Sequence, residues 1–137
     1  MPFANSNNNG LRTGMNRAMQ LRRQGRRREA VRILEGLASR HSRSAAVMGS
    51  LGSVYFELGL LAKAGKAFAQ AIELNPKSEM ASLGLFHSLW QQGARSEAFA
   101  EMSRFLSAAK SEEYTKLLRD LAVAGELAPK LTRAGAA

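Results

Sequence analysis

Glycines at a fixed interval constrain this chain more than any other feature. Gly25, Gly59 and Gly93 stand 34 residues apart. An alanine follows each glycine at the same offset: Ala30, Ala64 and Ala98. A glycine just past a helix ends it at little cost by adopting the left-handed conformation, and an alanine lets two antiparallel helices approach closely. The interval therefore predicts a unit of helix, glycine turn and helix that occurs three times.

The middle unit, residues 45–78, carries the fullest pattern. Its landmarks are Leu51, Gly52, Tyr55, Gly59, Ala64, Phe68, Ala71 and Pro76. On these residues the unit closely resembles a tetratricopeptide repeat. Residues 11–44 and 79–112 match less well: Gly14, Met48 and Ser82 stand where the family prefers tryptophan, and only the middle unit has the closing proline. The resemblance implies an all-α fold, an α–α superhelix of three helix-turn-helix repeats.

The two ends of the chain are expected to differ from the repeats. Ser111 can cap a last helix over residues 111–124, whose single apolar stripe is suited to cover the exposed end of a solenoid. The folded domain is then expected over residues 11–128. The first ten residues, MPFANSNNNG, predict a disordered polar tail, and residues 129–137 predict a loose one.

Composition excludes several classes of function. The 137 residues suffice for one domain, and the absence of cysteine excludes disulfides and thiolate catalysis. Neither an apolar run of membrane-spanning length nor a secretory signal is found, so we expect a cytoplasmic protein. Two histidines in different repeats, one aspartate and no phosphate-binding loop predict no enzyme, no metal and no cofactor. Glu97 and Glu101, one helical turn apart, are expected on a solvated surface.

The resemblance also implies a groove for a partner, because the first helix of each repeat in this family lines the concave side. Transferring the family's groove positions gives Met15, Met19, Arg22, Gly49, Ser50, Ser53, Phe56, Met80, Leu83, His87, Trp90 and Gln91. Small residues would let a guest backbone come close, while methionine and aromatic side chains adapt to a guest or anchor it. The alternative is that the methionines and Trp90 belong to the core between repeats.

One known use of the family is argued against. Members that hold a C-terminal carboxylate place lysine, asparagine and arginine at set groove positions. The matching positions here are Met15, Met19, Ser50, Met80 and Gly84. The clamp is therefore absent.

Positive charge gathers at one end of the chain. The formal net charge is +9, and residues 1–44 hold ten arginines against two acids. Five of these arginines flank the first glycine turn and form what we call the basic corner: Arg22, Arg23, Arg26, Arg27 and Arg28. Three interpretations stay open: a solvated face, a contact for an acidic protein, and a contact for nucleic acid or anionic lipid. Residues 11–44 contain no aromatic residue for stacking on bases, which weighs against nucleic acid.

The sequence thus predicts a protein–protein interaction module, such as an adaptor, a secretion chaperone or an immunity-type binder. A peptide or helix of the partner would lie in the concave groove, and the basic corner would contact its acidic groups. The alternative is a nucleic-acid-associated protein that uses the arginine-rich end. Three repeats are near the minimum for stability, so a homo-oligomer is a further open alternative.

Overall fold

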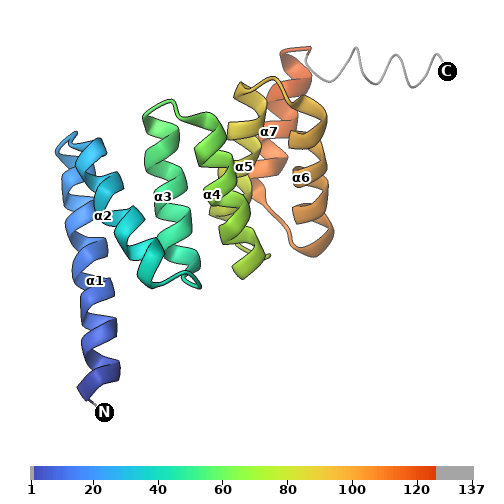
Figure 1. The fold of residues 1–137 in the computed structure, drawn as a ribbon. Coiled ribbons are helices and arrows are strands. Elements are labelled where there is room, and N and C mark those ends of the chain that lie inside the picture. Colours follow the sequence, from blue (N-terminus) through green and yellow to red (C-terminus); the bar gives the residue numbers. More distant parts are fainter. Residues whose placement is uncertain (1, 126–137) are drawn as a thin grey trace.

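The computed structural model describes residues 2–125, which form seven helices joined by short connections (Figure 1). The helices are α1 (Pro2–Arg23), α2 (Arg27–Arg40), α3 (Ala45–Glu57), α4 (Leu61–Leu74), α5 (Glu79–Gln91), α6 (Arg95–Ala108) and α7 (Glu112–Val123). They pair as α1 with α2, α3 with α4 and α5 with α6, and α7 follows the third pair. The predicted all-α solenoid of three helix pairs and a capping helix is confirmed.

The turns within the pairs are the glycines of the repeat. Gly25, Gly59 and Gly93 have φ angles of 79°, 76° and 82°, in the left-handed region where a side chain would be strained. The alanines that follow them are fully buried. The 34-residue period therefore predicts where the first helix of each pair ends and which alanine at the start of the second helix is buried.

Serines begin the helices that start a new unit. The hydroxyl groups of Ser44, Ser78 and Ser111 accept hydrogen bonds from backbone N–H groups in the first turns of α3, α5 and α7, at 3.0–3.2 Å. Such caps satisfy donors that a helix start otherwise leaves unpaired. The predicted cap at Ser111 is confirmed.

The first helix is longer than the sequence suggested. The sequence predicts a disordered tail over residues 1–10, whereas in the structure α1 begins at Pro2 and its first turns project past the end of α2 (Figure 1). A proline suits the first position of a helix, and extending a helix costs far less than nucleating one. The predicted loose tail, residues 129–137, lies outside the described residues.

One buried aromatic ring, which we call the Phe68 wedge, packs between the second repeat and the third. Phe68 of α4 is buried, and its ring lies against two glycines, Gly52 of α3 and Gly84 of α5. A Cβ atom at Gly84 would come within 2.4 Å of the ring, and one at Gly52 within 2.9 Å. The missing side chains of both glycines thus make room for this ring.

The third repeat is tied to α7 by a buried polar network. Tyr114 and Ser82 are fully buried, and their hydroxyl oxygens lie 2.7 Å apart. The Ser82 hydroxyl donates to Glu101 at 2.6 Å, and Arg104 donates to both oxygens of the same carboxylate at 2.7 and 2.8 Å. The expectation that Glu101 is solvated is wrong, because only 9% of it is exposed. The network joins side chains of α5, α6 and α7, and it satisfies a buried charge.

Candidate functional site

The first helices of all three repeats meet around one hollow, which we call the central hollow. Its volume is about 210 Å³. The lining residues are Arg22 of α1, Ser53, Phe56 and Glu57 of α3, Phe68 of α4, and Met80, Gly84 and His87 of α5. Five residues of the predicted groove are therefore brought together here: Arg22, Ser53, Phe56, Met80 and His87. Met80 is half-exposed, at 51%, although it is a large apolar side chain.

The small residues of the predicted groove make room for side chains of this chain, whereas the sequence suggested that they make room for a partner. The space beside Gly84 is filled by the Phe68 ring, and a Cβ atom at Gly49 would lie 2.7 Å from the Met80 methyl group. The chain's own side chains therefore use the room that was expected to admit a guest backbone. Ser53 is a small residue of the predicted groove that lines the central hollow.

Trp90 belongs mainly to the packing of the third repeat. Its ring stacks on Phe86 with centroids 5.7 Å apart and meets the edge of Phe99 at 5.6 Å. The Arg95 guanidinium lies 4.5 Å from the Trp90 centroid, a cation–π geometry. Of the two interpretations weighed from the sequence, these contacts favour core packing.

The remaining groove candidates are scattered. Met15 and Met19 are half-buried against the main core cluster, with the Met19 sulfur 4.0 Å from Arg22 Nη1. Ser50 is half-buried, and Gln91 is exposed at the last position of α5. None of these four lines the central hollow.

Leu83 and His87 line a second hollow, which we call the cap hollow. It has a volume of about 180 Å³, and its other walls come from α7: Glu113, Lys116, Leu117 and Asp120. The sequence predicts helix α7 but does not indicate that it lines the groove. The signal was present, because these four residues share one face of a helix by their spacing of three and four.

His87 stands between the two hollows, since it lines both. Its ring meets the Phe86 ring edge to face at 5.5 Å. Desolvation by the surrounding side chains lowers the pKa of His87 from its ordinary value of 6.5. The imidazole is therefore neutral at physiological pH and presents one donor and one acceptor.

The basic corner is partly neutralised by acids of its own chain. Arg22 Nε lies 2.7 Å from Glu57 Oε1, and Arg27 Nε lies 3.6 Å from the same oxygen. Arg26 pairs with Glu29 at 2.6 Å within the first turn of α2. Arg23 and Arg28 are exposed, and no ion pair is found for either within residues 2–125. The turn also borders a shallow hollow of about 350 Å³, with Gly25 and Leu58 beside Arg26, Arg27 and Arg28.

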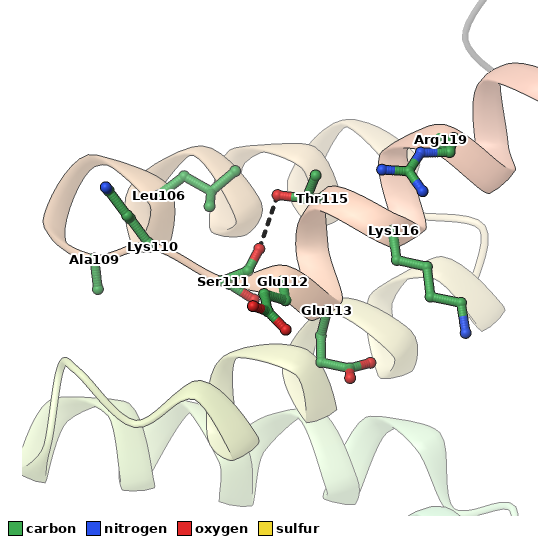
Figure 2. A pocket seen from close by; sticks show the side chains of 9 residues that line it. All are labelled: Leu106, Ala109, Lys110, Ser111, Glu112, Glu113, Thr115, Lys116 and Arg119. Atoms are coloured by element: carbon green, nitrogen blue, oxygen red, sulfur yellow. Dashed lines mark hydrogen bonds between the residues drawn. The ribbon is translucent and has the colours of Figure 1, made fainter.

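A larger, open hollow of about 600 Å³ lies at the connection between α6 and α7 (Figure 2). It is lined by Leu106, Ala109, Lys110, Ser111, Glu112, Glu113, Thr115, Lys116 and Arg119. The Thr115 hydroxyl donates to the Ser111 carbonyl at 2.9 Å and so uses its hydrogen within α7. Within residues 2–125, no group of three or more histidine, aspartate or glutamate side chains could hold a metal ion.

These features define a class of protein, a short α-helical solenoid that presents the first helices of its repeats along one hollowed face. Residues 15–79 match the family model for the tetratricopeptide repeat. The described helices fit three such repeats and a capping helix, so the described part of the chain has the fold of a tetratricopeptide-repeat solenoid. Members of this family mediate protein–protein interaction and peptide binding. No curated protein matches the sequence at a significant level.

Solved structures share the fold at low sequence identity. The first tetratricopeptide-repeat domain of Spaghetti (RPAP3), bound to the HSP90 peptide SRMEEVD, has a TM-score of 0.75 and 20% identity over 85% of this chain and 93% of its own. The Yersinia enterocolitica type III secretion translocator chaperone SycD has a TM-score of 0.74 and 17% identity over 91% and 95%. A mutant of MamA has a TM-score of 0.66 and 19% identity over 74% of each chain.

Within the described part of the chain, no helix is both long and apolar enough to cross a bilayer.

Proposed function

We propose that this chain is an interaction module that holds a peptide or helix of a protein partner in its concave groove. The observation that carries this proposal is the central hollow, where the first helices of three successive repeats converge around a half-exposed Met80. Phe56 adds an aromatic wall and Ser53 a small one. An apolar recess rimmed by charged groups is typical of a surface that takes one large apolar side chain of a partner.

The basic corner would contact acidic groups of the same partner. Arg23 and Arg28 support this role, because both are exposed and no ion pair in the described part of the chain occupies them. Arg22 and Arg27 are less available, since Glu57 already faces both. Guanidinium groups recognise carboxylates through paired hydrogen bonds, so the exposed pair is suited to this contact.

A C-terminal carboxylate is not the ligand we propose. The clamp positions hold Met15, Met19, Ser50, Met80 and Gly84. None of these side chains can donate the charged hydrogen bonds that a carboxylate needs. The shared fold with SycD leaves a role as secretion chaperone among the proposals, beside adaptor and immunity-type binder.

The test compares two apolar-to-acid substitutions at exposed residues. Met80→Glu places a charge in the central hollow, whereas Leu74→Glu, at a 36% exposed residue near the end of α4, places the same charge away from it. Tagged full-length proteins carrying either change would be used to purify partners from the native cell, followed by calorimetry with the purified partner. We expect Met80→Glu to lose the partner and Leu74→Glu to retain it. Retention by both variants would refute the groove.

A nucleic-acid partner would give a different result. Its affinity would fall steeply with salt and would survive Met80→Glu, because phosphate contacts depend on the arginines.

A further inference from the structure

The groove does not stop at the third repeat. His87 lines both the central hollow and the cap hollow, so the two recesses are neighbours. Leu83 of α5 and Leu117 of α7 give the cap hollow an apolar floor. A segment that rests on Met80 and passes His87 therefore reaches α7.

The charges at the two ends of this path are opposite. At the α1 end, Arg22 and Arg27 share the single carboxylate of Glu57, which leaves one positive charge in excess. The exposed Arg23 lies next to Arg22 at the end of α1 and adds to this excess.

At the α7 end, carboxylates are in excess. Glu113 and Asp120 line the cap hollow with a single cation, Lys116. Figure 2 shows Glu113 and Lys116 projecting from the same side of α7. All three side chains are exposed, and no ion pair within 4.0 Å joins them in the described structure.

We propose that the groove takes an extended segment with an ordered charge pattern: an acidic residue toward α1, apolar residues over Met80 and His87, and a basic residue toward α7. This inference rests on the proposed function and specifies its partner. The apolar floor of the cap hollow suits the stem of a lysine or arginine, whose charged end would lie between Glu113 and Asp120. Complementary charges at two ends also fix the direction in which the segment lies.

The span sets the length of the segment. From α1 to α7 the path crosses three helix spacings of roughly 8–10 Å each, or roughly 24–30 Å in all. An extended chain advances about 3.3 Å per residue, so the acidic and basic residues would stand about seven to nine residues apart. The small volumes of the two hollows, about 210 and 180 Å³, suit single side chains of such a segment better than the face of a whole helix.

Three synthetic peptides of nine residues test the charge pattern. They share an apolar centre of leucine and alanine, are blocked at both termini, and carry acid and base, acid and acid, or base and base at their ends. Binding to the full chain is measured by fluorescence anisotropy at low ionic strength. We expect the acid–base peptide to bind about five- to tenfold more tightly than either of the others, since each of the others faces one like charge.

Charge reversal in the cap hollow supplies the matched test. Glu113→Lys combined with Asp120→Lys should move the preference to the acid–acid peptide. Glu73→Lys combined with Glu97→Lys changes the net charge equally at exposed residues outside both hollows, and it should leave the preference unchanged. Binding that needs Met80 but is equal for all three peptides would overturn the charge pattern and leave the proposed function standing. If Met80→Glu does not remove the binding of any peptide, the charge pattern and the proposed function are both refuted.

Discussion

One substitution separates the general effect of glycine in a helix from the packing at the Phe68 wedge. Gly84 and Gly36 both lie inside helices, α5 and α2, where alanine is ordinarily the better residue. A Cβ atom at Gly36 would meet only the end of the Arg40 side chain, at 4.0 Å, whereas one at Gly84 would lie 2.4 Å from the Phe68 ring. The same chemical change should therefore have opposite effects on stability.

The expected magnitudes follow from two terms. Replacing a helical glycine by alanine raises the free energy of unfolding by about 0.5–1 kcal/mol. Overpacking a buried site costs about 1–3 kcal/mol, because Phe68 is only 3% exposed and its ring is rigid. The propensity term is common to both variants and cancels in the comparison. We therefore expect Gly84→Ala to be less stable than Gly36→Ala by about 1–3 kcal/mol.

Urea denaturation followed by circular dichroism measures both variants against the unmodified chain. The stability of Gly49→Ala should lie between those of Gly84→Ala and Gly36→Ala. The close neighbour of Gly49 is the flexible end of the half-exposed Met80, which can move aside. In a Phe68→Leu background, the cost of Gly84→Ala should shrink, since the ring that causes the clash is gone. If Gly84→Ala and Gly36→Ala stabilise the protein equally, the Phe68 ring does not occupy the space beside Gly84 as described.

Three further outcomes test other parts of the structure. Arg104→Ala removes both arginine hydrogen bonds from the buried Glu101 carboxylate and should lower the free energy of unfolding by about 2–4 kcal/mol in urea denaturation; a loss below about 0.5 kcal/mol would contradict the network. Burial raises the pKa of Tyr55 and of Tyr114 to about 12, so their contribution to stability is complete below pH 10, the ordinary tyrosine pKa, and is lost as pH rises toward 12. Phenolate absorbance at pH 10 should therefore be nearly absent from the folded protein and appear on unfolding, and half-ionisation of the folded protein at that pH would disprove the burial. The NMR titration of His87 should give a pKa below 6.5, because desolvation disfavours the imidazolium; a value above 6.5 would contradict its placement between the two hollows.

The repeat made most of the fold predictable. Gly25, Gly59 and Gly93 end their helices as expected, because a positive φ angle is a local requirement that the residue itself reveals. Ser111 likewise identifies the start of α7 through a hydrogen bond within one helical turn. Local rules of this kind need no knowledge of the neighbours.

Long-range packing was not predictable in the same way. Glu101 looked solvated because its spacing from Glu97 describes only its own helix, whereas the Ser82 and Tyr114 hydroxyls come from elsewhere in the chain. Gly84 matches a groove position of the family, and nothing in its own repeat indicates that Phe68 fills the space beside it. The first turns of α1 were missed because a polar composition does not prevent an established helix from extending.

The polar contacts at the two ends of the solenoid differ in how far salt can reach them. Each repeat touches only its neighbours, so local opening begins at the ends. The C-terminal end is closed by a polar network around fully buried Ser82 and Tyr114, where salt has little access. The N-terminal repeat also has a hydrogen bond from a buried tyrosine, from Tyr55 to Glu35 of the first repeat, but it is tied to the second repeat as well by the Arg22–Glu57 pair, whose side chains are 32% and 30% exposed and are therefore screened as ionic strength rises. Amide exchange in α1 and α2 should thus depend on salt, while exchange in α5 and α6 should not.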